Sequence, residues 1–155
     1  MKAIKQSAGI LLYRRKNNGV EFFLVHPGGP FWAKKDAGAW SIPKGEFIDE
    51  DPLEAAKREF LEETGKMPAF KHFIKLSPVK LKSGKTVHAW GAEGDVDETT
   101  IRSNTFQLEW PPKSGKIIQV PEVDKAGWFT PDKATEKINS SQAAFITELA
   151  NLVNL

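Results

Sequence analysis

Hydrophobic residues in the first third of the chain fall into two short runs with a polar break between them. Ala3 to Arg15 and Val20 to His26 are predicted strands, and Asn17-Asn18-Gly19 is the turn that joins them into a hairpin. Gly9 interrupts the first run. A glycine inside a strand lets a neighbouring backbone approach closely, so another segment is expected to pack there.

Shorter runs continue the strand pattern through most of the remaining chain. A breaker-rich loop, His26 to Trp32, precedes them. Polar loops are expected at Asp97 to Asn104 and at Pro112 to Gly115. The predicted strands are Trp40 to Gly45, Phe70 to Lys82, Lys85 to Val96 after a turn at Ser83-Gly84, Thr105 to Trp110 before Pro111-Pro112, and Ala126 to Phe129.

Helical signals occupy two regions of the chain. Asp51 is a good N-cap, Pro52 suits the first helical position, Glu54 completes a capping box, and Gly65 closes the helix. Near the other end, Thr130-Pro131 starts a short helix. Ser140 or Ser141 caps a final helix whose apolar positions are Phe145, Ile146, Leu149, Leu152 and Val153. Strands interleaved with helices predict an α/β (α+β) fold with a mixed sheet sandwiched between helices.

Three carboxylates share one face of the first substantial helix. Glu59, Glu62 and Glu63 lie within an arc of roughly 100°, where like charges repel. Either plain solvation or a bound cation accounts for such a cluster, and hard divalent cations prefer oxygen ligands. Arg58 stands one turn before Glu62, within reach of its carboxylate.

The segment Gly45 to Gly65 resembles the signature of the Nudix hydrolase family, in which Arg-Glu-hydrophobic-x-Glu-Glu-x-Gly follows an earlier glutamate by seven residues. Here Glu50 and the run Arg58 to Gly65 fit. Two features depart from the family pattern. The pattern has five residues between its first glycine and this glutamate, whereas four separate Gly45 from Glu50, and Lys66 stands where the family has a hydrophobic residue. The shorter loop leaves either Glu50 or Asp51 for the role of the first glutamate.

The resemblance implies a Nudix-like α/β/α sandwich and a hydrolase that uses Mg²⁺, with Mn²⁺ as a substitute. It implies that Glu59 and Glu63 bind the metal, that Glu62 binds metal or water, that Arg58 orients a carboxylate, and that Glu50 supports them without ligating. Pro43-Lys44-Gly45 is similar to the diadenosine-polyphosphate and diphosphoinositol-polyphosphate branches of the family. In this turn, Lys44 either contacts a substrate phosphate or is a solvated lysine. Gly45, the next residue, belongs to the same expected substrate-binding turn.

A general base outside the helix is also expected, because glutamates committed to metal cannot readily accept a proton from water. Glu122 is the first candidate; it stands six residues before Trp128, as in the diadenosine-polyphosphate hydrolases that this segment resembles. Glu109 is the second candidate. Stacking of a nucleobase is expected from aromatic residues beside loops, namely Phe31, Trp32 and Trp110.

Bulk composition narrows the function classes. The 155 residues suit a single domain, 1–155, and the absence of cysteine excludes disulfides and thiolate chemistry. A net charge of +2 with dispersed lysines argues against polymeric nucleic acid as a partner. The first 15 residues carry neither a signal-peptide core nor a membrane span, so a cytoplasmic location is expected. No pattern indicates an oligomeric state, and the three histidines share no metal-like spacing.

The sequence therefore predicts a hydrolase that cleaves a pyrophosphate linkage in a nucleoside diphosphate derivative. Dinucleoside polyphosphates are favoured slightly over nucleoside triphosphates because of the Lys44-Gly45 turn; NDP-sugars and dinucleotide cofactors stay open. The competing hypothesis is a nucleotide-binding or sensor module on the same fold, without turnover. The presence of all three helix glutamates favours the enzyme.

Overall fold

The computed structural model describes residues 5–153, so Ala3 and Ile4 of the first predicted strand lie outside the described part. A mixed sheet of seven strands forms its centre, with the order β4-β6-β1-β2-β9, while β3 pairs with β1 and β5 with β6. The β1–β6 pairing is parallel and the others are antiparallel. The strands are β1 Gln6–Lys16, β2 Gly19–Pro27, β3 Lys44–Phe47, β4 Lys71–Lys75, β5 Val79–Lys80, β6 Thr86–Glu93 and β9 Val123–Phe129.

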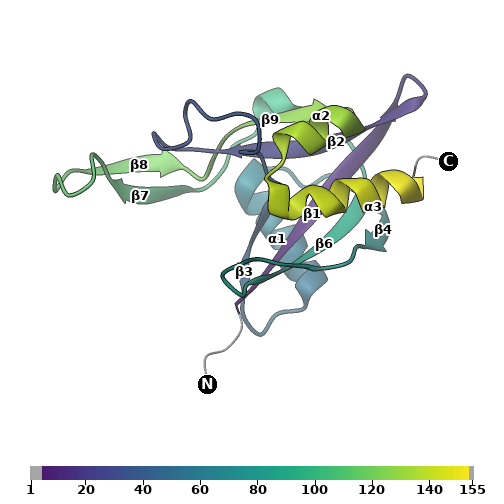
Figure 1. Cartoon of the computed structure of the whole chain (residues 1–155), viewed down its shortest axis with the longest axis horizontal. Helices are drawn as coiled ribbons and strands as arrows, with labels where there is room; N and C mark the ends of the chain where they lie inside the picture. Colours follow the sequence, from purple (N-terminus) through teal and green to yellow (C-terminus); the bar gives the residue numbers. More distant parts are fainter. Residues whose placement is uncertain (1–4, 154–155) are drawn as a thin grey trace.

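Helices cover both faces of this sheet (Figure 1). α1 (Pro52–Thr64) lies on one face, and α2 (Pro131–Lys137) and α3 (Ala143–Val153) lie on the other. Alternation along β1 explains the arrangement, because successive side chains point to opposite faces. Ile10 joins the core under α1, and Leu11 joins the core under α3. The predicted α/β/α sandwich is confirmed.

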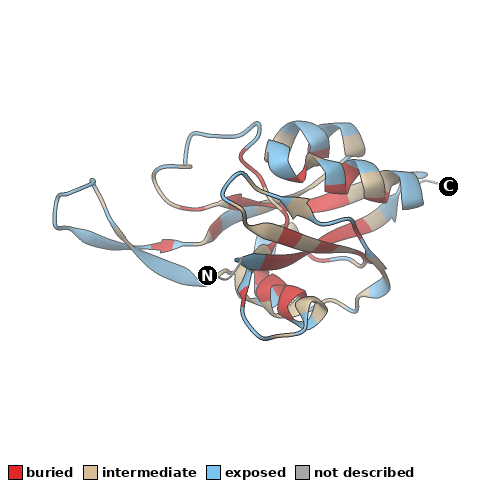
Figure 2. Cartoon of the chain, turned by 60° about the horizontal axis from the view of Figure 1, so that its bottom comes forward, coloured by how far each residue is buried: buried red, intermediate tan, exposed pale blue. Residues whose placement is uncertain are grey.

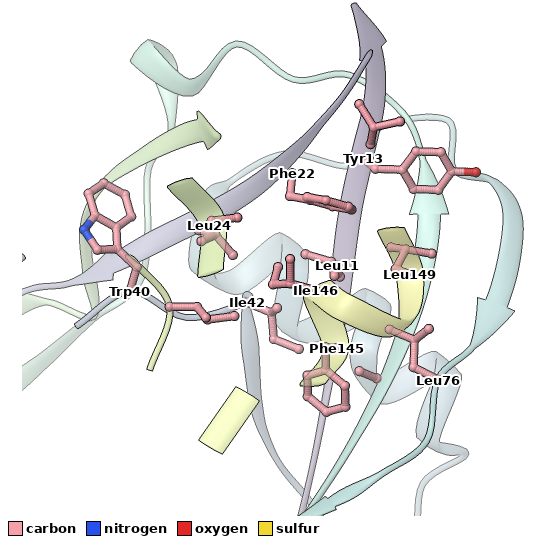
Figure 3. Close-up of a cluster of buried hydrophobic side chains, with 14 of the residues drawn as sticks. Leu11, Tyr13, Phe22, Leu24, Trp40, Ile42, Leu76, Phe145, Ile146 and Leu149 are labelled. Carbon is pink, nitrogen blue, oxygen red and sulfur yellow. The ribbon is translucent and has the colours of Figure 1, made fainter. Parts of the chain in front are cut away.

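The core beneath α3 is shown in Figure 3, where Phe145, Ile146 and Leu149 meet side chains of β1 and β2. Each fully buried side chain of this size contributes about 1.5–3 kcal/mol relative to an exposed one. Leu152, expected on the same stripe, is 48% exposed. The packed face of α3 is therefore narrower than its apolar pattern predicted.

Gly9 allows the close approach that the sequence predicted. A Cβ atom there would lie 2.5 Å from the carbonyl oxygen of Pro43 and 2.6 Å from the Cβ of Lys44. β3 can therefore lie close beside β1 as its antiparallel partner, with Gly9 opposite Lys44 and Ala8 opposite Gly45. This pairing places Gly45 against Glu59 of α1.

Two predicted strands are shorter than expected. The Phe70 to Lys82 run is divided into β4 and β5, because the backbone leaves the ladder at Leu76 to Pro78 and the Leu76 side chain enters the core. In the Trp40 to Gly45 run, only Lys44 onward is regular strand; Trp40 and Ser41 make isolated bridges. Proline residues, which lack an N–H donor, stand at both interruptions.

One strand escaped the sequence prediction. β7 (Thr105–Glu109) pairs with β8 (Ile117–Pro121), a segment for which no strand was expected, and β9 begins at Val123 rather than at Ala126. The β7–β8 hairpin projects from the body and is mostly exposed (Figures 1 and 2). It buries little apolar surface, so periodicity was a weak guide.

The helix ends follow local chemistry with one correction. Asp51 accepts a hydrogen bond from the backbone N–H of Glu54 at 3.1 Å, and Gly65 ends α1 with φ 72°. The final helix is not capped by Ser140 or Ser141: these residues belong to a 3-10 turn, η2 (Ser140–Gln142), whose cap is Asn139. A second 3-10 turn, η1 (Glu98–Thr100), lies within the predicted polar loop after β6.

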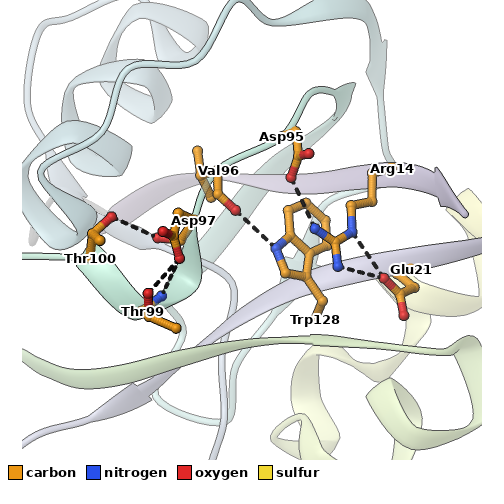
Figure 4. A network of polar contacts seen from close by, with 8 residues as sticks. All are labelled: Arg14, Glu21, Asp95, Val96, Asp97, Thr99, Thr100 and Trp128. Carbon is orange, nitrogen blue, oxygen red and sulfur yellow. Dashed lines mark hydrogen bonds and ion pairs between the residues drawn. The ribbon is translucent and has the colours of Figure 1, made fainter.

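A polar network ties β1, β2 and β9 to the loop after β6 (Figure 4). The Arg14 guanidinium pairs with Glu21 and Asp95 and lies 4.2 Å from the centre of the Trp128 ring. Trp128 donates to the carbonyl of Val96 at 3.1 Å. Trp128 is thus a packing residue of β9. No helix within residues 5–153 is long and apolar enough to cross a lipid bilayer.

Candidate active site

Glu59 is the most buried of the helix glutamates, and Gly45 makes room for it. A Cβ atom on Gly45 would lie 2.0 Å from the Oε2 atom of Glu59 and 2.5 Å from Oε1. Only 7% of Glu59 is exposed, so its carboxylate rests directly on the backbone of β3. The absence of a side chain at Gly45 therefore leaves the space that the Glu59 carboxylate occupies.

Arg58 gathers three carboxylates at the exposed side of α1. Its Nε and Nη2 donate to the two oxygens of Glu50 at 3.0 and 2.9 Å, and Nη1 donates to Glu59 at 2.9 Å and to Glu62 at 3.2 Å. These hydrogen bonds raise the pKa of Arg58 and lower the pKa of Glu50. Asp51 is occupied as the helix cap, which leaves Glu50 as the glutamate that reaches this cluster.

Glu63 faces the opposite side of the cluster, toward Lys44 and Glu122. Its Oε1 accepts a hydrogen bond from the backbone N–H of Lys44 at 3.3 Å. Burial raises the pKa of Glu63 to about 8; the Lys44 bond opposes the shift, and the charges of Glu122 and Glu59 add to it. The pKa of Glu59 is also raised, first by burial and then by the charge of Glu62.

These carboxylates suit a hard divalent cation by their chemistry. Oxygen donors are the ligands that Mg²⁺ takes, and crowding of buried negative charge, expressed in the raised pKa values, is what a cation relieves. Within residues 5–153, no group of three or more His, Asp or Glu side chains already has the arrangement of a metal cage. Mg²⁺ commonly keeps several waters and takes few protein carboxylates, so the donor set still fits.

A cavity of about 210 Å³ opens beside Glu63. It is lined by Lys44, Glu63 and Glu122 and by the ring of Trp32. Ser41, Asn139 and Gln142 add polar groups to the lining, which sequence reasoning had not placed there. A glutamine just before an apolar helix was the one available signal, and it carries no meaning until the fold brings the Gln142 side chain to the backbone N–H of Ile42, which donates to it at 3.0 Å.

Backbone hydrogen bonds hold Glu122 at this cavity. The Glu122 N–H donates to the carbonyl of Asn104 at 2.8 Å, and the Asn104 N–H donates to the carbonyl of Glu62 at 2.9 Å. On its other side, the N–H of Gly28 donates to the Glu122 carbonyl at 3.0 Å. Burial, and then the charge of Glu62, raise the pKa of the Glu122 side chain. The β8–β9 junction is thus tied to the last turn of α1.

Glu109 lies elsewhere. Its carboxylate accepts hydrogen bonds from the backbone N–H groups of Lys113 and Gly115, at 3.1 and 3.2 Å. It therefore closes the turn of the projecting β7–β8 hairpin, where Trp110 also lies (Figure 1). Neither residue lines the cavity.

The two aromatic candidates of the loop after β2 differ in position. Trp32 lines the cavity and packs against the core under α3. Phe31 is 56% exposed, contacts the edge of Trp32, and lies 3.7 Å beneath the Lys35 ammonium. Phe31 is outside the cavity lining.

This combination of an α/β/α sandwich and a glutamate-bearing helix defines a Nudix-type domain. The NUDIX domain model matches residues 4–149, so the chain belongs to the Nudix family, and membership supports a hydrolase that acts on pyrophosphate bonds. Among curated proteins, none matches this sequence significantly.

Solved structures show the same fold. The Ap4A hydrolase of C. elegans, in a binary complex, has a TM-score of 0.64 at 19% identity, over 97% of this chain and 98% of that one. The NUDIX domain of Shewanella oneidensis NrtR, complexed with ADP ribose, has a TM-score of 0.63 at 17% identity, over 98% and 89%. The MutT protein of Methanosarcina mazei Go1 has a TM-score of 0.60 at 20% identity, over 97% and 96%. At these identities the likeness concerns the fold alone.

Proposed function

We propose that the protein is a Mg²⁺-dependent hydrolase, with Mn²⁺ as a substitute, that cleaves a pyrophosphate linkage in a nucleoside diphosphate derivative. One observation carries the proposal. Glu63 of α1 and Glu122 line a single cavity together with Lys44 and Trp32. Two other carboxylates of α1, Glu59 and Glu62, accept hydrogen bonds from Arg58. An acidic centre, a cation and an aromatic wall are the parts that a nucleotide pyrophosphate requires.

Each residue has a role in this proposal. Glu59, Glu62 and Glu63 would hold Mg²⁺, which when bound neutralises phosphate charge and lowers the pKa of an attacking water. Arg58 donates hydrogen bonds to Glu50, Glu59 and Glu62 and so would hold these carboxylates in fixed orientations.

Proton transfer falls to Glu122. As base it takes a proton from water while a new P–O bond forms and the bridging P–O bond breaks, and the leaving phosphate carries away the bridging oxygen. Its raised pKa moves it toward the working range of a general base.

Lys44 and Trp32 bear on the substrate. Partial burial lowers the pKa of Lys44, while the nearby Glu63 opposes that shift. An additional phosphate would be matched to this ammonium. The cavity, at about 210 Å³, is below the ~300–1,000 Å³ typical of sites that enclose a whole ligand, so it suits one nucleoside end with the phosphate chain running outward. Both points favour a dinucleoside polyphosphate, with nucleoside triphosphates second.

A substrate panel tests the proposal. Diadenosine tetraphosphate, nucleoside triphosphates, ADP-ribose and an NDP-sugar are incubated with the full chain, with Mg²⁺, with Mn²⁺ and with EDTA, and mononucleotide release is measured. We expect turnover only with a divalent cation, fastest on diadenosine tetraphosphate. Binding of nucleotides without turnover on every member would replace the enzyme by the sensor module, and turnover in EDTA would remove the metal from the mechanism.

A further inference from the structure

His26 is a fully buried histidine at the end of β2, outside the carboxylate cluster. Its Nδ1 atom lies 2.9 Å from a carboxylate oxygen of Asp124, and its Nε2 atom lies 2.6 Å from the backbone carbonyl oxygen of Lys35. The two partners approach from different segments: Asp124 belongs to β9, and Lys35 belongs to the loop between β2 and β3. Both ring nitrogens therefore have one partner each.

Both of these partners are acceptors. A backbone carbonyl can only accept, and an ionised carboxylate can only accept. A neutral imidazole has one N–H, so one of its nitrogens would point a lone pair at an oxygen. Leaving a buried polar group without a partner costs free energy, and the cost is larger beside a charged group. Two ring protons satisfy both contacts, and the same proton count is kept if the shared proton moves to Asp124.

The bond to Lys35 governs the position of Trp32. The Lys35 N–H donates to the Trp32 carbonyl at 2.9 Å, and the Trp32 N–H donates to the Gly29 carbonyl at 3.2 Å. These two successive turns place Trp32 in the wall of the cavity, and the imidazole holds their far end. Other ties, from Gly38 to Glu136 and from Asp36 to Lys137, act closer to β3.

The charged groups around the imidazole are few. Asp124 contacts it from β9, and the Trp40 ring packs edge-on against it with centroids 5.2 Å apart. Two charged residues contact Trp40 in turn. Asp36 accepts a hydrogen bond from the Trp40 indole N–H at 2.8 Å, and the Lys125 ammonium lies 5.7 Å from the centre of the Trp40 ring. The Lys35 ammonium points away, to Phe31. Within residues 5–153, Asp124 is the one carboxylate in direct contact with His26.

We propose that His26, held as an imidazolium between Asp124 and the Lys35 carbonyl, is a positioning residue that fixes the Trp32 loop for substrate binding. Loss of the bond to the Lys35 carbonyl frees one end of the loop, so Trp32 is less well placed and the KM rises, while kcat, set by the carboxylates, is kept. The kinetic part rests on the proposed function. The protonation and the loop position do not.

Two variants separate charge from shape. In Asp124→Asn the amide can donate to an unprotonated Nδ1 while Nε2–H still serves Lys35, so the loop stays anchored without the imidazolium. His26→Gln offers a side-chain amide that cannot span both partners, and the Lys35 contact is expected to be lost. His72→Asn is the control, because His72 is exposed and lies in β4, away from this contact.

The first measurement needs no substrate. Nitrogen-15 spectra of the full chain, with His26 assigned through His26→Gln, report whether both ring nitrogens carry protons, and 5-fluorotryptophan spectra report the environment of Trp32. We expect two protonated nitrogens in the wild type, one in Asp124→Asn, and a displaced Trp32 signal in His26→Gln only. A neutral His26 in the wild type overturns the inference, as does an unchanged Trp32 signal in His26→Gln.

The second measurement is kinetic, with Mg²⁺ and diadenosine tetraphosphate. We expect His26→Gln to raise KM about tenfold, as for the loss of one charge-assisted hydrogen bond, with kcat within about threefold. The control His72→Asn should keep its KM within about threefold of the wild type. Equal KM values in His26→Gln and His72→Asn overturn the inference. If His26→Gln fails to fold, Asp124→Asn still decides; if no nucleotide is hydrolysed, the proposed function fails while the spectra test the imidazolium alone.

Discussion

Gly45→Ala should separate catalysis from stability, because the added methyl group lands on a carboxylate. The new Cβ would lie 2.0 Å from Oε2 and 2.1 Å from Cδ of Glu59. An ordinary contact needs at least 3.4 Å, so the carboxylate must withdraw by more than about 1 Å. The backbone itself can accept alanine, since Gly45 is not among the positive-φ glycines of the described chain.

The magnitudes follow from what the carboxylate loses. A displacement of about 1 Å in a catalytic group costs on the order of 10²-fold in rate, or about 2.7 kcal/mol of transition-state stabilisation. Stability should change little. The hydrogen bond from Arg58 to Glu59, at 2.9 Å, is weakened by about 1 kcal/mol, and alanine restores about 0.4–1 kcal/mol by restricting the unfolded chain.

The assay combines steady-state turnover with Mg²⁺ and urea denaturation followed by circular dichroism. Gly19→Ala is the matched control, because its Cβ would have an ordinary contact of 3.5 Å with the Lys16 carbonyl. We expect a drop in kcat of about 10²-fold for Gly45→Ala alone, with free energies of unfolding within about 1 kcal/mol of the wild type. Turnover within about threefold of the control would refute the reasoning, and a joint collapse of stability and turnover would assign Gly45 to the fold instead.

Three further predictions concern the carboxylates. Without metal, the raised pKa of Glu63 means that the folded state binds its proton more tightly than the unfolded state, so the free energy of unfolding should fall by roughly 3–5 kcal/mol as the pH rises from 4.5 to about 8. In thermal melts, Glu63→Gln should abolish this fall and Mg²⁺ should counter it. In kinetic assays, turnover of Glu63→Gln should drop about 10²-fold or more. Glu122→Gln should lower turnover about tenfold or more and remove the acidic limb of the pH–rate profile, whereas Glu109→Gln should leave both unchanged; an intact acidic limb in the first variant would exclude it as the base. Asp51→Ala should lower the free energy of unfolding by about 1 kcal/mol with a modest loss of turnover, and Glu50→Gln should do the opposite; calorimetry and kinetics showing the reverse would exchange the two roles.

Local sequence signals were sufficient for α1 and its glutamates. The cap at Asp51, the left-handed Gly65 and the shared face of the carboxylates depend on residues within a few positions of one another, so the helix and the family signature were readable directly. The same holds for the β1–β2 hairpin, whose turn at Asn17-Asn18 adopts the positive φ angles that such a turn needs. The cytoplasmic location and the substrate class stay predictions.

Tertiary structure decided what the local pattern left open. Glu122 meets Glu63 only because Asn104 bridges the β8–β9 junction to the end of α1, and its competitor Glu109 is carried away on a hairpin that buries little. His26 acquires its two acceptors from segments 9 and 98 residues away. Such contacts depend on which strands pair and how loops cross, and these choices are made by the burial of the whole core. Local sequence therefore determines the helices, their caps and the candidate carboxylates, whereas the partners of each charged side chain are determined only by the assembled tertiary structure.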